Sequence, residues 1–270
     1  MKIPFVKMHG LGNDFIIFDN IKNPIIHDSK FINKISNRRL GVGCDQVLII
    51  KNLRFPENYR VTIYNSNGSE TGACGNGTRC VADYLMKKNK LNSLTIKSIS
   101  NEMLCSKIGN LVSVNMGEPK FGWKEIPLLK EQDTKTVKLD EFEAFCLSMG
   151  NPHAVIFLSK LEELENLKLN SIGPRLEKNL NFPEYANIEF VVVLEDKSLR
   201  MKVWERGVGV TSACGSGACA SLVAASSLNK SKKENKIISD GGDLFVKWHD
   251  NGSVTLSGET KKVFEGFIGD

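Results

Sequence analysis

The stretch Ala73-Cys74-Gly75-Asn76-Gly77 recurs as Ala213-Cys214-Gly215-Ser216-Gly217, 140 residues later in a chain of 270. A second echo lies near the start of each half, where Gly12-Asn13 and Gly150-Asn151 each precede an apolar run. Three further pairs match in the register of the first echo: Tyr64 with Trp204, Asn65 with Glu205, and Thr71 with Thr211. Several matches at nearly one offset predict that the chain holds two copies of one fold.

Each Cys-Gly-x-Gly pattern opens a predicted helix, and three short strands separated by turn residues follow each helix. The helices are predicted over 76–90 and 216–229, and the strands near 94–98, 103–107 and 111–116 and near 236–239, 243–248 and 253–257. The second helix is apolar nearly all round, which is typical of a helix enclosed by a sheet. The predicted fold class is therefore α+β, with two pseudo-symmetric domains, each a mostly antiparallel sheet wrapped around a central helix.

The stretch 118–138 contains prolines and lysines and is predicted to be a linker region. Residues 1–117 then form the N-terminal half, which carries Cys74, and residues 118–270 form the C-terminal half, which carries Cys214. A C-terminal strand over residues 262–270 is expected to pack back onto the first half. A pseudo-two-fold arrangement of the halves would bring equivalent loops face to face, so we expect an active site in the interdomain cleft.

The composition is that of a globular protein, with 41% hydrophobic, 25% charged and 8% aromatic residues. No stretch approaches the ~18 apolar residues of a membrane-spanning helix, and the N-terminus has no signal-peptide pattern, so we expect a cytoplasmic protein with no membrane partner. The net charge of +5 comes from dispersed lysines and arginines, which argues against a nucleic-acid partner. Seven cysteines, an odd number without close metal-ligand spacing, indicate neither a disulfide framework nor a structural metal site.

Cys74 and Cys214 each precede a glycine at a predicted helix N-terminus. The free amides and the positive end of the helix dipole favour a thiolate, which predicts a lowered thiol pKa, and they can also bind a carboxylate. Two such thiols on opposite sides of one ligand would supply a base on one face of a carbon and an acid on the other. That arrangement suits inversion of the carbon next to a carboxylate.

Other functions remain open for the same residues. A redox protein would join the two thiols, although it would usually carry a C-x-x-C motif. A cysteine hydrolase would pair one cysteine with His153 and leave the second loop unexplained. Asn13 and Asn151 could be turn formers, His153 a loop histidine, and Glu205 with Arg206 a surface ion pair.

The chain resembles the diaminopimelate epimerase family along its whole length. The motifs that carry the resemblance are Met8-His9-Gly10-Leu11-Gly12-Asn13-Asp14-Phe15, Gly41-Val42-Gly43-Cys44-Asp45-Gln46, residues 65–80, Gly150-Asn151-Pro152-His153, Asn187, Trp204-Glu205-Arg206-Gly207 and residues 213–220. The resemblance implies a cytoplasmic, homodimeric isomerase of lysine and peptidoglycan-precursor biosynthesis. Such an enzyme interconverts LL- and meso-2,6-diaminopimelate without pyridoxal phosphate, any other cofactor or a metal.

The resemblance also implies roles for individual residues. Cys74 and Cys214 match the catalytic positions, and His153 and Glu205 match positions that modulate the thiol pKa. The substrate-binding positions match Asn13, Gln46, Asn65, Gly75, Asn76, Asn151, Asn187, Glu205, Arg206, Gly215 and Ser216. Val210 departs from the family pattern, because many members have glutamate there.

Two functions are alternatives to diaminopimelate epimerisation. A racemase of another amino acid, such as proline, would use the same two-thiol chemistry, but Asn65, Asn187 and Arg206 favour a substrate with a second charged end. A binding or redox protein on a decayed epimerase scaffold is disfavoured because both cysteines and the full set of binding residues are present.

Overall fold

The computed structural model describes residues 2–21, 28–54, 57–72, 74–99 and 102–269, so Ala73 of the first motif lies outside the described residues. The chain divides into two compact units, which we call the first unit (Met1–Val114 with Gly258–Asp270) and the second unit (Asn115–Ser257). Each unit combines strands with a central helix, which confirms the predicted α+β fold class.

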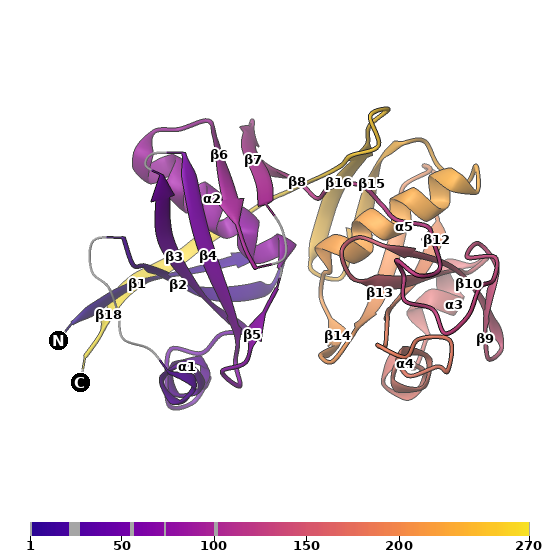
Figure 1. Ribbon diagram of the computed structural model, residues 1–270, viewed down its shortest axis with the longest axis horizontal. Coiled ribbons are helices and arrows are strands. Elements are labelled where there is room, and N and C mark those ends of the chain that lie inside the picture. Colours follow the sequence, from indigo (N-terminus) through magenta and orange to yellow (C-terminus); the bar gives the residue numbers. More distant parts are fainter. Residues whose placement is uncertain (1, 22–27, 55–56, 73, 100–101, 270) are drawn as a thin grey trace. The chain divides into compact units, whose positions relative to one another are not determined.

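In the first unit a mostly antiparallel sheet encloses helix α2 (Gly75–Asn89), which contacts five of its strands (Figure 1). In the order in which they pair, the strands are β18 (Lys261–Ile268), β1 (Ile3–Gly10), β2 (Asn13–Asp19), β3 (Gln46–Arg54), β4 (Asn58–Asn65), β6 (Ser93–Lys97), β7 (Glu102–Ile108) and β8 (Leu111–Asn115). The pairs β2–β3 and β4–β6 are parallel. The short strand β5 (Glu70–Thr71) also pairs with β4, and helix α1 (Ser29–Ser36) precedes β3.

The second unit repeats this plan around helix α5 (Gly215–Ser227). Its strands pair in the order β9 (Val137–Leu139), β10 (Phe142–Ser148), β11 (Pro152–Phe157), β12 (Asn187–Val193), β13 (Leu199–Glu205), β15 (Glu234–Ser239) and β16 (Gly242–Trp248). The parallel pairs, β11–β12 and β13–β15, fall at the same places as in the first unit. β14 (Gly209–Thr211) pairs with β13, and β17 (Val254–Gly258) completes the described strands.

Helices α3 (Leu161–Glu165) and α4 (Leu169–Glu177) pack against the second unit's sheet, where Leu164 and Leu176 join the same buried cluster as Ile188 and Phe190 of β12. Successive side chains of a strand point to opposite faces, so the intervening residues of β12, including Glu189, face the central helix α5. Each fully buried leucine or isoleucine of this cluster stabilises the fold by roughly 1.5–3 kcal/mol.

Two segments at the ends of the predicted halves have clear places in the fold. Residues 118–138, predicted to be a linker, contribute Ile126, Leu128 and Val137 to the buried cluster of the second unit, because these apolar side chains interrupt the polar stretch. The C-terminal strand β18 pairs with β1 of the first unit from Ile3–Ile268 to His9–Lys261.

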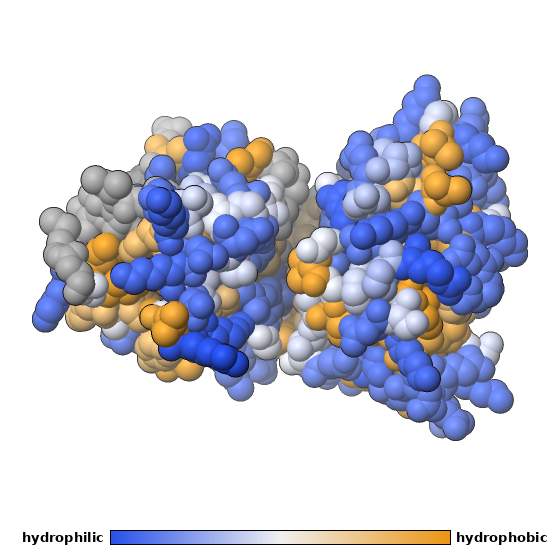
Figure 2. All heavy atoms as spheres, turned by 90° about the horizontal axis from the view of Figure 1, so that it is seen from below, coloured by the Kyte–Doolittle hydropathy of each residue, from blue (hydrophilic) through white to orange (hydrophobic). Residues whose placement is uncertain are grey.

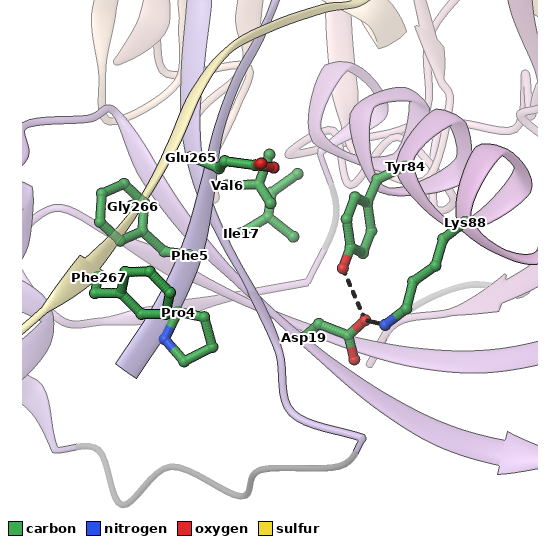
Figure 3. A pocket seen from close by; sticks show the side chains of 10 residues that line it. All are labelled: Pro4, Phe5, Val6, Ile17, Asp19, Tyr84, Lys88, Glu265, Gly266 and Phe267. Carbon is green, nitrogen blue, oxygen red and sulfur yellow. Dashed lines mark hydrogen bonds and ion pairs between the residues drawn. The ribbon is translucent and has the colours of Figure 1, made fainter. Parts of the chain in front are cut away.

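The exposed surface of the described residues is mixed in character, and Figure 2 shows hydrophobic patches scattered among hydrophilic side chains. β18 is unusual because Val263, Phe264 and Phe267 are all exposed. Beside it, β1, β2 and α2 line a cavity of about 320 Å³ with an apolar floor, where Tyr84 and Lys88 both contact Asp19 (Figure 3). None of the helices described is long and apolar enough to cross a membrane.

Candidate active site

Both repeated cysteines cap the N-terminus of the central helix of their unit. Cys74 Sγ accepts a hydrogen bond from the Gly77 amide of α2 at 3.3 Å, and Cys214 Sγ accepts one from the Gly217 amide of α5 at 3.4 Å. Both residues have extended backbone conformations, as N-cap residues do. Each thiol therefore lies at the positive end of a helix dipole, as the sequence predicts.

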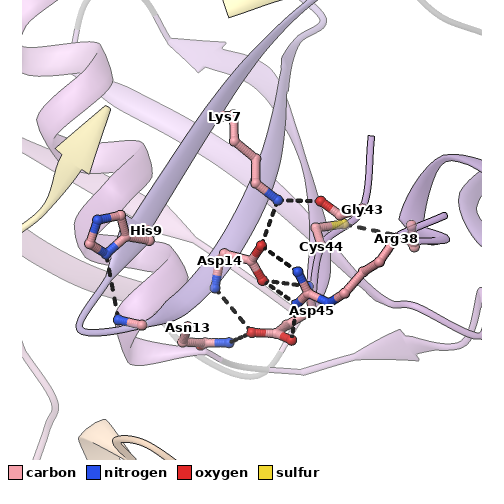
Figure 4. A network of polar contacts seen from close by, with 10 residues as sticks. Lys7, His9, Asn13, Asp14, Arg38, Gly43, Cys44 and Asp45 are labelled. Carbon is pink, nitrogen blue, oxygen red and sulfur yellow. Dashed lines mark hydrogen bonds and ion pairs between the residues drawn. The ribbon is translucent and has the colours of Figure 1, made fainter. Parts of the chain in front are cut away.

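Asn13 in the first unit is held by Asp45 (Figure 4), and its carbonyl oxygen faces Cys74. The turn before it needs a glycine, since Gly12 has φ 86°. Asn13 Nδ2 donates to Asp45 Oδ2 at 2.9 Å, which leaves Oδ1 to accept from the Cys74 thiol at 3.7 Å. Asp45 thus fixes which end of the Asn13 amide the thiol meets.

Asp45 belongs to a charged cluster around Asp14. Arg38 donates to both carboxylates, at 2.7 Å for each of the closest contacts, and Lys7 donates to Asp14 at 2.6 Å and to the Gly43 carbonyl. Burial alone would raise the pKa of Asp14, but the hydrogen bonds from Arg38 and Lys7 hold it well below its usual range. Asp14 is therefore charged at neutral pH, and the cluster supports the Asn13 turn.

Asn151 is the equivalent residue in the second unit, and a buried pair holds it. His153 and Glu189 are both fully buried, and His153 Nδ1 lies 2.7 Å from Glu189 Oε1. On its other side, His153 Nε2 lies 3.0 Å from Asn151 Oδ1. Glu189 thus fixes the orientation of the His153 ring, and the ring in turn holds Asn151.

The pKa of Cys214 is raised well above its ordinary value, contrary to the expectation of a lowered thiol pKa at a helix N-terminus. Burial is the largest cause, and the negative charges of Glu205 and Glu189 add to it. The hydrogen bonds from Ser216 and the Gly217 amide favour the thiolate but are the smaller effects. A pKa raised in this way favours the protonated thiol of Cys214 at neutral pH.

Glu205 lies beside Cys214 and is itself desolvated. Burial raises its pKa, against hydrogen bonds from Thr211 and Cys214 that favour the carboxylate. The Thr211 hydroxyl donates to Glu205 Oε1, so the carboxylate has a fixed partner on β14. Val210, where many relatives were expected to have glutamate, is half-exposed on the same short strand.

The remaining predicted binding residues lie at strand ends and in the two loops. Gln46 Nε2 donates to Asn65 Oδ1 at 3.0 Å, and the buried Gln46 Oε1 has no hydrogen-bond partner in the part of the chain that the structure describes. Asn187 donates to the Pro152 carbonyl and accepts from the Arg206 amide, both at 2.9 Å. The Arg206 guanidinium donates to the Glu184 carbonyl at 3.1 Å. Gly75, Asn76, Gly215 and Ser216 form the first turns of α2 and α5.

Glu189 is the residue that motif reading missed. It lies in the run Ile188-Glu189-Phe190-Val191-Val192, and a carboxylate inside an otherwise apolar, buried strand was the signal available. Its Oε2 atom has no hydrogen-bond partner among the described residues.

Comparison with known proteins places the chain in a family. A family model described as Diaminopimelate epimerase matches residues 5–122 and 145–263. The chain belongs to the diaminopimelate epimerase family. The two matched segments begin at the offset that separates Cys74 from Cys214, so the match follows the repeat.

Relatives in the diaminopimelate epimerase family match the chain almost end to end. The diaminopimelate epimerase of Acidiphilium cryptum is 42% identical over 97% of this chain and 95% of its own, and that of Rhodospirillum centenum is 39% identical over 98% and 92%. A solved hydroxyproline epimerase from Agrobacterium vitis has a TM-score of 0.66 at 12% identity, covering 99% and 92% of the two chains. A phenazine biosynthesis protein of Bacillus anthracis has a TM-score of 0.69 at 14% identity over 100% of both, so these two structures share the fold.

Proposed function

We propose that this chain is a diaminopimelate epimerase that interconverts LL- and meso-2,6-diaminopimelate by two-base proton transfer at one α-carbon. It acts in the cytoplasm, in lysine and peptidoglycan-precursor biosynthesis, and uses no cofactor. The observation that carries the proposal is the pair of capping cysteines at equivalent helix N-termini in a chain 42% identical to a diaminopimelate epimerase.

Cys74 and Cys214 are the proposed proton carriers on opposite faces of the substrate. Cys214, whose pKa burial and two carboxylates raise, is the proposed proton donor in one direction of the reaction, with Cys74 as the proton acceptor. The opposite protonation state runs the reverse reaction. The backbone amides at the starts of α2 and α5 bind the reacting carboxylate and stabilise the charge that builds on it when the α-proton leaves.

The other end of the substrate needs its own recognition. Arg206 pairs with the distal carboxylate, because a guanidinium presents two parallel donors to it. The amides of Asn65 and Asn187 bind the distal ammonium and carboxylate groups, since each side chain both donates and accepts. Asn13, Gln46, Asn76, Asn151, Glu205 and Ser216 complete the binding set.

Proton NMR of LL-diaminopimelate in deuterium oxide tests this function. Reduced protein without added cofactor should remove the α-proton signal and produce the meso form. No exchange into diaminopimelate, with exchange into proline under the same conditions, would instead assign the chain to the racemases of other amino acids. No exchange into either would contradict an epimerase function.

We also propose that the protein is a homodimer that pairs through β18. Both faces of this strand are exposed in the single chain, and Val263, Phe264 and Phe267 present apolar surface to solvent. Light scattering after size-exclusion chromatography should give twice the chain mass of 30.0 kDa. Phe267→Glu should shift the protein to the monomer, and a monomeric wild-type protein would contradict the proposal.

Replacing Asp45 by alanine is expected to lower kcat/KM by about 10-fold or more, because the Asn13 amide loses the partner that turns its oxygen toward Cys74. Asp45 is half-exposed, so the fold should persist. Steady-state assays of Asp45→Ala beside Asp250→Ala, which removes a fully exposed aspartate from the second unit, make the comparison. Equal kcat/KM in the two variants would mean that Asp45 does not orient Asn13.

A further inference from the structure

The two units surround their cysteines with different chemistry although their backbones correspond. In the second unit, two carboxylates act on Cys214, Glu189 on β12 and Glu205 on β13, and His153 on β11 contacts Glu189. Strand pairing gives the counterparts in the first unit, since Phe15 pairs with Gln46 as His153 pairs with Asn187. The counterparts are Phe15, Leu48 and Asn65, which carry no charge.

Glycines on the central helices show that Leu48 and Glu189 occupy the same place. A Cβ atom on Gly77 of α2 would meet Leu48 Cδ1 at 3.1 Å and Cys74 Sγ at 3.4 Å. A Cβ atom on Gly217 of α5 would meet Glu189 Oε1 at 2.6 Å and Cys214 Cβ at 3.3 Å. The Glu189 carboxylate thus lies against the first turn of α5, where the first unit has a leucine.

Glu189 is not needed to fill this space, since leucine does so in the first unit. A fully buried carboxylate is costly when one oxygen contacts His153 and the other has no hydrogen-bond partner among the residues described. Its retention indicates a role beyond packing.

We propose that Glu189 is a positioning residue: it fixes His153, and through it Asn151, and holds a negative charge against the first turn of α5 that makes the environment of Cys214 unlike that of Cys74. The role presupposes the proposed epimerase activity. Asp45 holds Asn13 directly through a hydrogen bond in the first unit. Glu189 holds Asn151 in the second unit, but it acts through His153 and from a buried position.

The proposed negative charge on Glu189 disfavours the thiolate form of Cys214. Glu189 and Glu205 both disfavour the thiolate of Cys214, and His153 contacts Glu189 with one ring nitrogen and Asn151 with the other. Removing the charge at Glu189 makes the Cys214 thiolate easier to form. Cys74, in the other unit's loop, should keep its own behaviour.

The test is the pH dependence of alkylation of each cysteine by iodoacetamide, resolved by mass spectrometric fragmentation. Glu189→Gln keeps a hydrogen-bond acceptor for His153 and removes the charge, so the alkylation midpoint of Cys214 should fall by about one pH unit. Glu189→Leu, which copies Leu48, should lower it as well and also release His153. Glu165→Gln is the matched control, because it removes a half-exposed glutamate of the same unit that pairs with Arg200 and Lys202.

A second readout reports on His153 itself. Nitrogen-15 NMR of labelled protein should show the proton on Nδ1 in the wild type and in Glu189→Gln, and its loss or redistribution in Glu189→Leu. In the epimerase assay, Glu189→Leu should lower kcat by about 100-fold with a smaller change in KM, because Asn151 loses its support.

Unchanged Cys214 alkylation and an unchanged His153 signal in folded Glu189→Leu would overturn the proposal. These two measurements need no substrate, so they test the positioning role of Glu189 even if diaminopimelate fails to react. Failure of the wild-type protein to exchange the α-proton would instead count against the proposed function. Thermal unfolding of each variant establishes that it is folded.

Discussion

Alanine in place of Cys74 or Cys214 is expected to lower the epimerisation rate by about 1,000-fold or more, because each change removes one of the two proton carriers. One remaining thiol could take the α-proton but could not deliver another to the opposite face. The loss should appear in kcat with little change in KM, since neither thiol is assigned to hold the ends of the substrate. Turnover of LL-diaminopimelate, followed by NMR or by optical rotation, measures it.

The control must separate chemistry from folding. Each thiol also caps a helix by accepting from Gly77 or Gly217, and loss of a cap costs roughly 0.5–2 kcal/mol. Serine restores the cap without a comparably acidic proton, so Cys74→Ser and Cys214→Ser should be stable and equally inactive. Cys105→Ala removes a fully buried thiol whose pKa burial raises to about 12, and it should keep near wild-type activity. Turnover within 10-fold of wild type by either alanine variant would contradict the two-base mechanism.

The duplicated pattern was enough to predict the central features of each unit. A cysteine before Gly-x-Gly implies a helix start, and both helices begin one residue after the cysteine. The apolar character of residues 216–229 correctly predicts that α5 is enclosed by a sheet. These features are local or repeat along the chain, so periodicity and an internal match suffice to find them.

Features that depend on distant residues were harder to predict. The pKa of Cys214 is raised mainly by burial and then by carboxylates from two other strands, so reasoning from the helix dipole alone gave the wrong sign. Glu189 lies between apolar neighbours, and its importance appears only when the sheet brings it to His153 and α5. Ile126 and Leu128 pack into the second unit, although the residues around them are typical of a loop.

The pseudo-symmetry of the chain is therefore one of backbone and of capping thiols, and it does not extend to the charges. A symmetric pair of thiols would suit a substrate whose two stereoisomers present the same groups. Diaminopimelate carries a second stereocentre with its own ammonium and carboxylate, so the two sides of the reacting carbon are unequal. The carboxylates of Glu189 and Glu205, which act on Cys214 at positions where the first unit has Leu48 and Asn65, are consistent with that substrate.

Mild oxidation with diamide is expected to abolish activity by joining Cys74 to Cys214. In the proposed mechanism the two sulfurs lie on opposite faces of the same substrate α-carbon. A small movement would then bring them close enough to form a disulfide. The first thiolate adds to diamide, the second displaces the resulting hydrazine, and two electrons and two protons pass to the oxidant. Non-reducing peptide mapping should find the linked peptides, and dithiothreitol should restore the activity.

The pH dependence of this oxidation follows from the raised pKa of Cys214. The second step needs the Cys214 thiolate, which is scarce at neutral pH, so cross-linking should accelerate steadily as the pH rises through the alkaline range. Cys74→Ser should give no link and serves as the control, and Glu189→Gln should cross-link faster than wild type at the same pH. Inactivation without a Cys74–Cys214 link, or without recovery on reduction, would contradict this prediction. It would mean that the two thiols do not come within disulfide reach and do not exchange protons with the same α-carbon.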